Sequence, residues 1–164
     1  QAKNVQQAQN CKEQLMADTV TSQTIQDGER VAVLKFTNES DGTGEASVKK
    51  VDVSALSANS KGQACTGVSI SRIYWACRGM GVDIEFDATT NVLAIPLPAD
   101  STGDEYYDLF TGIPNNAGSG VTGDLDFTTV GHSNGDAYSI ILVLTKNLIK
   151  TSLKFVYPKL NEPS

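Results

Sequence analysis

The sequence predicts an all-β protein: a single antiparallel β-sandwich, like a jelly roll, that follows an N-terminal helical or extended arm. Short apolar segments that alternate with polar residues recur along most of the 164 residues, which is typical of half-buried strands. The 14 glycines, with frequent Ser, Thr and Asn, favour many turns between short strands. We divide the chain into an arm at 1–27, a sandwich core at 28–147, and a C-terminal strand and tail at 148–164.

The arm differs in composition from the rest of the chain, because it is rich in Gln and Ala and has no Gly or Pro. Val5, Ala8, Cys11 and Leu15 are spaced three, three and four residues apart, which places them on one face of a helix. This face is narrow, so such a helix needs a surface to lie on. That surface is either the arm's own domain or a neighbouring subunit.

The expected strands follow from apolar runs between turn signals. In order, they are residues 31–36, 46–53, 69–77, 82–86, 92–97, 124–130, 137–144 and 148–157. The apolar alternation of 46–53 changes phase near Lys49 and Lys50, which indicates a β-bulge. Residues 57–67 are small and polar and are expected to form a loop. In the following strand Trp75 shares a face with Ile73 and Cys77, which favours a position in the core.

The middle of the chain predicts a hairpin followed by a long connection. Residues 82–86 alternate cleanly, and a short turn leads into 92–97, so the two strands are expected to pair. Pro96 places the second strand at a sheet edge or strand end, because proline has no N–H to donate to the ladder. Residues 98–120 contain aromatic and turn-forming residues and are expected to form a connection without a strand.

The strongest hairpin signal is Asn134-Gly135, because these residue types readily adopt the positive φ angles of a type I′ turn. It is expected to join strand 124–130 to strand 137–144. The second of these is apolar on both faces, as a central strand would be.

Charge and hydropathy argue against two classes of partner. The net charge is −6, and Lys49-Lys50 is the only adjacent basic pair. Nucleic-acid binding depends on Lys and Arg that neutralise phosphates, so no nucleic acid is expected. No apolar run approaches the roughly 18 residues that cross a bilayer, so no membrane partner is expected.

The three cysteines, Cys11, Cys65 and Cys77, are odd in number and include no C-x-x-C pair. Cys65 and Cys77 can meet across a hairpin, but buried free thiols are the favoured interpretation. Free thiols fit assembly in a reducing cytosol.

No pattern in the sequence indicates an enzyme, a metal or a cofactor. His132 is the only histidine and directly precedes a turn, which favours a polar strand-end residue over a catalytic base. Asp83 and Glu85 share a strand face, as paired glycosidase carboxylates can, although a solvated acidic face is the commoner arrangement. The acidic loop 100–108 either binds calcium through oxygen ligands or is simply solvated.

Aromatic residues offer an alternative function. A platform for a sugar ring can be lined by Tyr74, Trp75, Tyr106, Tyr107 and Phe110, in which case the chain is a carbohydrate- or host-surface-binding β-sandwich module.

Four segments together carry a family resemblance. They are SRIYW at 71–75, FDATT at 86–90, NNAGSGVTGD at 115–124 and TTVGHSNGDAYSIIL at 128–142. In this order they resemble small virion structural proteins of tailed bacteriophages, marine and cyanobacterial phages above all. The resemblance covers about 69–146, roughly half of the chain. Its motifs are turn and strand signatures and describe no chemistry.

The resemblance implies a protein present in many copies in the virion, assembled in the cytoplasm of the host bacterium. The favoured role is a capsid decoration or cement protein that binds the major capsid protein as a homo-oligomer, a dimer or a trimer. A neck or tail component is the alternative. Cement proteins often grip neighbours with terminal extensions, so we expect the partner interface at Val5, Ala8, Leu15, Leu153, Phe155, Tyr157 and Lys159.

Overall fold

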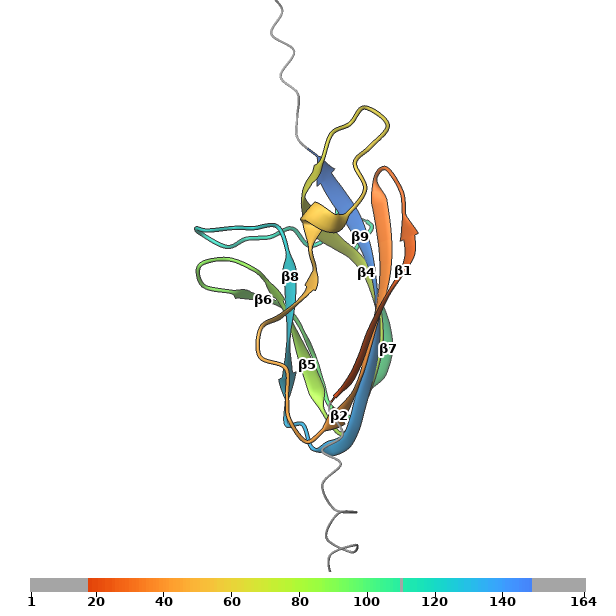
Figure 1. The fold of residues 1–164 in the computed structure, drawn as a ribbon, viewed down its shortest axis with the longest axis vertical. Coiled ribbons are helices and arrows are strands. Elements are labelled where there is room, and N and C mark those ends of the chain that lie inside the picture. The colour runs from red at the N-terminus through yellow and green to blue at the C-terminus, as the bar shows by residue number, and fades with distance from the viewer. Residues whose placement is uncertain (1–17, 110, 149–164) are drawn as a thin grey trace, which may run out of the picture.

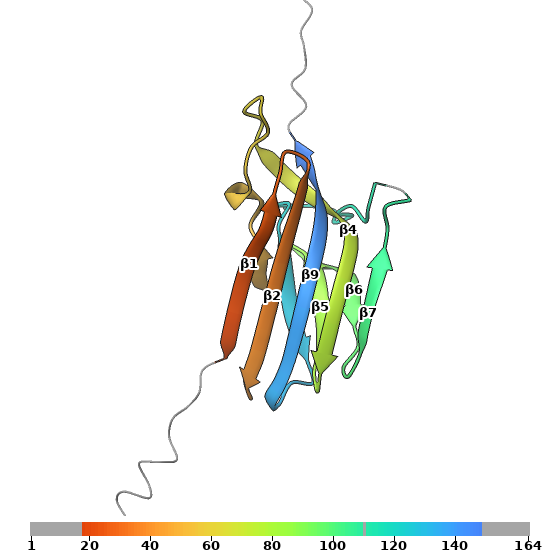
Figure 2. The same ribbon diagram turned by 90° about the vertical axis from the view of Figure 1, so that its right-hand side faces the viewer.

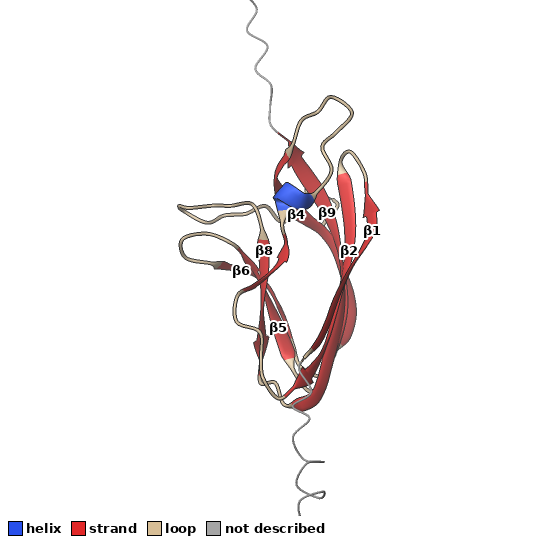
Figure 3. Cartoon of the chain, viewed as in Figure 1, coloured by secondary structure: helices blue, strands red, loops and turns tan. Residues whose placement is uncertain are grey.

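The computed structural model describes residues 18–109 and 111–148. These residues form nine strands and one short 3-10 helix (Figures 1 and 3). The strands are β1 (Thr19–Asp27), β2 (Val31–Asp41), β3 (Val48–Val51), β4 (Cys65–Arg78), β5 (Gly81–Phe86), β6 (Val92–Leu97), β7 (Thr102–Tyr106), β8 (Leu125–Val130) and β9 (Asn134–Leu148), with η1 at Val53–Ala55. The helical face at Val5, Ala8, Cys11 and Leu15 and nearly all of the strand expected at 148–157 lie outside the described residues.

The strands form two antiparallel sheets with the order β1-β2-β9-β4-β7 and β3-β8-β5-β6. β2 pairs with β9, β3 with β8, β4 with β7 and β5 with β6. The chain is therefore a long antiparallel ribbon that doubles back between β5 and β6 and is rolled up, so that successive ribbon segments alternate between the sheets. This is the topology of a jelly roll, to which β1 is added at the edge beside β2. The expected all-β sandwich is confirmed.

The core lies between the two sheets and follows from alternation along each strand. In β2 the buried apolar residues are Ala32, Leu34 and Phe36, with half-buried residues between them. Phe36 of one sheet meets Phe127 of the other edge to face, with ring centroids 5.4 Å apart. Full burial of each such side chain is worth about 1.5–3 kcal/mol, so this layer of apolar residues holds the sheets together.

Several local predictions are confirmed. The β5–β6 hairpin forms, and Pro96 lies in β6 at the edge of its sheet. The register of β3 against β8 shifts between Lys49 and Val51, which is the expected bulge. β9 is the middle strand of the five-stranded sheet, as its two apolar faces indicated; Figure 2 shows it between β2 and β4.

Two segments assigned to an arm and to a connection are strands. Residues 19–27, placed in the arm, form β1, and the connection 98–120 contains β7. All side chains of β1 except that of Asp27 are exposed, as are most of those of β7. Neither strand therefore carries the apolar alternation that sequence reasoning depends on; they are held by backbone pairing to β2 and β4.

The hairpin expected at Asn134-Gly135 is wrong. β8 and β9 lie in different sheets, so this turn carries the chain from one sheet to the other. Of the two central residues only Gly135 has a positive φ, 86°, whereas a type I′ turn needs both. The pairing of β9 with β2 and β4 on both sides leaves it no free edge for β8.

Candidate functional site

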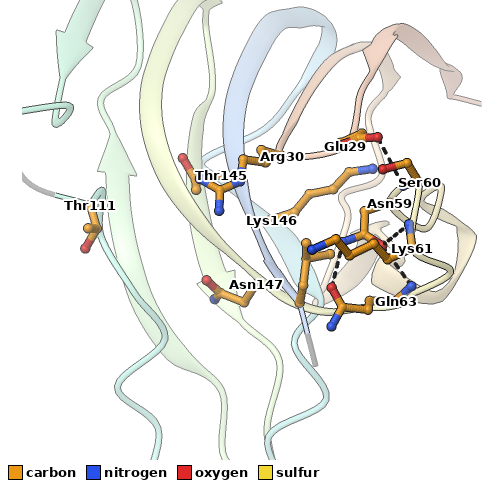
Figure 4. A pocket seen from close by; sticks show the side chains of 11 residues that line it. Glu29, Arg30, Asn59, Ser60, Lys61, Gln63, Thr111, Thr145, Lys146 and Asn147 are labelled. Atoms are coloured by element: carbon orange, nitrogen blue, oxygen red, sulfur yellow. Dashed lines mark hydrogen bonds between the residues drawn. The ribbon is translucent and has the colours of Figure 1, made fainter. Parts of the chain in front are cut away.

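A polar pocket of about 860 Å³ lies at one end of the sandwich (Figure 4). Its walls are formed by the β1–β2 turn, the loop between η1 and β4, the end of β9, and Thr111 in the connection between β7 and β8. Its lining residues are polar or charged with one exception: Glu29, Arg30, Asn59, Ser60, Lys61, Gln63, Thr111, Thr145, Lys146, Asn147 and Leu148. Three are cationic and one is a carboxylate, in a chain whose net charge is −6.

Lys146 anchors the pocket. Its side chain is 0% exposed, and its ammonium group pairs with the carboxylate of Asp27 and donates to the carbonyl oxygen of Ser57 at 2.9 Å. The N–H of Ser57 donates to the same carboxylate at 2.7 Å. Burial raises the pKa of Asp27, but the hydrogen bonds from Lys146 and Ser57 outweigh it, so the pKa lies below its ordinary value. The charge of Lys146 is thus used to hold the loop to the end of β1.

Asn59 gives the loop wall its shape. Its side-chain oxygen accepts from the backbone N–H groups of Lys61 and Gln63, at 3.0 and 2.9 Å, and its amide nitrogen donates to Oε1 of Gln63 at 2.7 Å. An asparagine that hydrogen-bonds to the backbone two residues on stabilises a turn. The loop is therefore ordered by its own contacts.

Two cations of the pocket are available to a ligand. Within the described part of the chain, no hydrogen bond or ion pair engages the side chains of Arg30 or Lys61. Hydrogen bonds from Ser60 lower the pKa of Glu29, and the charges of Lys61 and Arg30 lower it further. A planar guanidinium binds carboxylate or phosphate through two parallel hydrogen bonds. The pocket can therefore accept an anionic group.

The carboxylates considered for hydrolysis lie elsewhere. Asp83 and Glu85 are on β5, paired with Thr128 and Asp126 of β8. The carboxylate of Glu85 accepts from Thr128 Oγ1 at 2.8 Å and from Ser47 Oγ at 3.3 Å. It is thus bound to two hydroxyl groups that link the β2–β3 loop to β8, a structural use of the charge.

His132 lies beside the same loop. Its Nδ1 is 3.4 Å from Oγ1 of Thr129, and a Cβ on Gly44 would overlap its ring. The histidine is half-buried just after β8, in agreement with the expected polar residue at a strand end.

The acidic loop 100–108 does not gather its carboxylates. Asp100 accepts from the N–H of Gly79 at 2.7 Å, whereas Asp108 pairs with Arg72. Among residues 18–109 and 111–148, no three His, Cys, Asp or Glu side chains form a group that could hold a metal ion. The calcium interpretation gains no support from these residues.

The aromatic residues do not form one flat platform. Trp75 packs against the core, and its Nε1 donates to Ser101 Oγ at 3.0 Å. Tyr74 and Tyr106 lie together on the outer face, but their ring planes are 82° apart at a centroid distance of 6.0 Å. Tyr107 packs against the core, and Phe110 lies outside the described residues. A sugar would therefore meet one exposed ring, Tyr106, with Arg72 4.8 Å from its centroid.

Cys65 and Cys77 are buried free thiols, as favoured, and burial raises the pKa of Cys77 to about 11. Cys11 lies outside the described residues. Lys49 and Lys50 form no basic patch, because Lys49 pairs with Asp124 and Lys50 pairs with buried Glu45.

The expected interface residues Val5, Ala8, Leu15, Leu153, Phe155, Tyr157 and Lys159 all lie outside the described residues. The pocket was not found from the sequence, because Arg30 and Lys61 are isolated cations in separate loops and form no motif. Its wall includes Leu148, the last described residue of the chain.

None of the helices in the described residues has the length and apolar character to cross a membrane. Comparisons of the chain with protein-family models, with curated proteins and with solved structures give no match.

Proposed function

We propose that this chain is a virion structural protein, a capsid decoration protein that binds the outer surface of the major capsid protein shell of a tailed phage. The observation that carries the proposal is the jelly-roll topology, which viral capsid proteins and lectins share. By analogy with proteins of the same topology, the fold favours either a viral capsid protein or a lectin. The resemblance at 69–146 to phage virion proteins, a span that runs from β4 through most of β9, favours the first.

The internal contacts of the sandwich support a structural role. Three sets of contacts hold loops to strands: Lys146 and Asp27 both bind Ser57, Lys50 pairs with buried Glu45, and Glu85 binds Ser47. A protein that covers the seams of a capsid shell must resist deformation, and these contacts stiffen the ends of the sandwich. The proposal accordingly assigns the chain binding rather than catalysis.

The polar pocket at the end of the sandwich is the docking site that we assign to the described part of the chain. Arg30 and Lys61 face an anionic group of the shell protein, a carboxylate from Asp or Glu. The acidic character of the rest of the chain disfavours approach of an acidic surface elsewhere. Each contact is small, but many copies on one shell gain strength from multivalency.

A cryo-electron microscopy reconstruction of particles tests the location. Density for this jelly roll in icosahedral register over the shell is the expected result. Density confined to the neck or tail would remove the decoration role, and absence from particles would remove the virion role.

Reconstitution tests the docking site. Purified full-length chain is added to particles that lack it, and occupancy is measured for wild type, Arg30→Ala and Lys61→Ala. The two variants are expected to bind more weakly, and the wild type to lose affinity as salt rises. Lys35→Ala, which removes a cation from β2 outside the pocket, is the matched control. Equal occupancy for all variants would discard the pocket as the docking site.

The second candidate is a carbohydrate- or host-surface-binding module. It is favoured by Tyr106, which is 47% exposed, with Arg72 against its ring, since aromatic rings commonly stack on sugars. A glycan array tests it with wild type and Tyr106→Ala. Glycan binding by the wild type that Tyr106→Ala abolishes would favour this function. No glycan binding by the wild type would leave the virion role.

A further inference from the structure

Four edge strands border the two sheets of the described structure: β1 and β7 on one sheet, β3 and β6 on the other. An edge strand presents unpaired N–H and C=O groups to any other strand, and proteins hinder such pairing with charge, proline or short length. Three of these edges carry such a feature. β6 contains Pro96, β7 contains Asp104 and Glu105, and β3 has only four residues, with Lys49 among them.

β1 is the unprotected edge. Residues 19–26 contain no charge, no proline and no glycine. Thr, Val and Ile predominate in this segment, and such β-branched residues favour strands. All eight side chains are exposed, Val20 at 45% and Ile25 at 50%. Its final residue, Asp27, has its charge paired with Lys146. Apart from the register shift between Thr24 and Gln26, nothing in β1 opposes a further strand at its outer edge.

We propose that β1 pairs antiparallel with β1 of a second copy of this chain about a two-fold axis. The two five-stranded sheets would then form one continuous sheet. A second copy is the occupant because copies of a chain with net charge −6 repel one another least where both surfaces are uncharged. A two-fold interface is self-complementary, so this strand meets its own sequence.

The side chains of β1 suit that pairing. Thr and Ser pairs across neighbouring strands hydrogen-bond to one another, and Thr21 already does so with Thr37 of β2. The register of β1 against β2 is regular from Thr19 to Thr24 and shifts before Gln26. In a two-fold antiparallel pair one residue lies opposite itself, so the axis is expected to pass near the middle of this regular stretch.

The interface buries only one strand per copy, so the dimer should depend on concentration. Sedimentation velocity of the full-length chain over a broad concentration range is expected to show a monomer–dimer equilibrium. Val20→Lys and Ser22→Lys place like charges across the axis and should weaken the dimer by about tenfold or more. Thr102→Lys on β7 adds the same charge at another exposed edge and should leave the equilibrium unchanged. Circular dichroism checks that each variant is folded.

Disulfide trapping tests the register. In a Cys11→Ser background, single variants Thr21→Cys, Ser22→Cys and Gln23→Cys are oxidised. The residue opposite itself should form a disulfide-linked dimer well above the level of the other two. A monomer at all concentrations, a closed trimer, or equal loss of dimer in Thr102→Lys would overturn the proposal. These outcomes leave the pocket variants and the capsid proposal untouched, because those are measured by particle occupancy.

Discussion

The hydroxyl group of Tyr138 donates a hydrogen bond to Oε2 of Glu45 at 2.7 Å in the buried space between the sheets. Glu45 belongs to the β2–β3 loop, yet it is only 7% exposed. Its other carboxylate oxygen pairs with Lys50, and its backbone N–H donates to Thr129 Oγ1 at 2.8 Å. The loop that crosses between the sheets is therefore bound to both of them, through β9 and through β8.

Removal of the Tyr138 hydroxyl should destabilise the fold. Tyr138→Phe leaves one oxygen of a buried carboxylate without its donor, at a cost of about 1–3 kcal/mol in the free energy of unfolding. Urea unfolding measures it. Tyr106→Phe removes a hydroxyl that is exposed on the outer face and should change the stability by less than about 0.5 kcal/mol. Equal effects of the two variants would contradict a structural role for the Tyr138–Glu45 bond.

The same tyrosine predicts a loss of stability at alkaline pH. Burial, followed by the hydrogen bond and charge of Glu45, raises the pKa of Tyr138 above its ordinary value of 10.0. The unfolded chain therefore releases this proton at a lower pH than the native chain does, and stability falls as pH rises past about 10. Tyr138→Phe should make the decline shallower between about pH 9 and 11. Part of the decline in stability should remain in this variant, because the pKa of Cys77 is also raised, to about 11. An unchanged slope would contradict the prediction.

The Asp27–Lys146 pair should respond unequally to loss of either partner. The Lys146 side chain is 0% exposed and that of Asp27 is 17% exposed. Asp27→Asn leaves a fully buried ammonium without its counter-charge and should cost about 3 kcal/mol. Lys146→Met leaves a carboxylate that water can reach and should cost less. Chemical unfolding of both variants measures the difference, and a larger loss for Lys146→Met would reverse this account.

The depressed pKa of Asp27 also has a pH consequence. A carboxyl whose native pKa lies below the unfolded value, here near 3.8, stabilises the fold above that pH. This contribution is lost as pH falls below the unfolded value and through the native pKa. The stability difference between wild type and Asp27→Asn should therefore shrink in acid, as measured by unfolding over a series of pH values.

Gly103 provides space for Trp75. A Cβ at this position would lie 2.5 Å from Cζ2 of the indole, so Gly103→Ala forces the ring or β7 to move. Overpacking of this kind costs about 1–3 kcal/mol, and tryptophan fluorescence should report the displaced ring. Gly118→Ala, where no atom lies within 4 Å of the added Cβ, is the matched control and should be nearly neutral. If Gly103→Ala leaves the stability unchanged, β7 moves easily to make room for the added methyl group.

Asp126 is expected to oppose folding at neutral pH. Burial raises its pKa, even though Asn91 donates to Oδ2 at 3.1 Å, and its Oδ1 has no hydrogen-bond partner among the described residues. The native state therefore binds the carboxyl proton of Asp126 more tightly than the unfolded chain does. Ionisation of this group above its unfolded pKa lowers the stability of the fold. Asp126→Asn should raise the free energy of unfolding at neutral pH by up to about 2 kcal/mol.

The gain from Asp126→Asn should diminish as pH falls into the range where the native carboxyl is protonated. Asp83→Asn, at a half-buried position of β5 that pairs with Thr128 rather than with Asp126, is the control and should show little effect. Thermal melts at several pH values make the comparison. A destabilised Asp126→Asn would mean that the charge itself is needed.

The sequence by itself determined the elements that have one buried face. β5 alternates Val82, Ile84 and Phe86 inward, β9 is apolar on both faces, and Pro96 marks an edge. These features are local, because alternate strand residues point to opposite faces whatever the strand pairs with. The class of fold and the β5–β6 hairpin could therefore be predicted.

Only the tertiary structure decided what depends on distant partners. β1 and β7 are strands because β2 and β4 offer them backbone hydrogen bonds, and the Asn134-Gly135 turn changes sheets because β9 is already paired on both sides. The bonds that shape the pocket and the buried loop join residues 119 and 93 positions apart. No local pattern encodes such pairs, since the roll of the ribbon brings them together only after the sheets have packed.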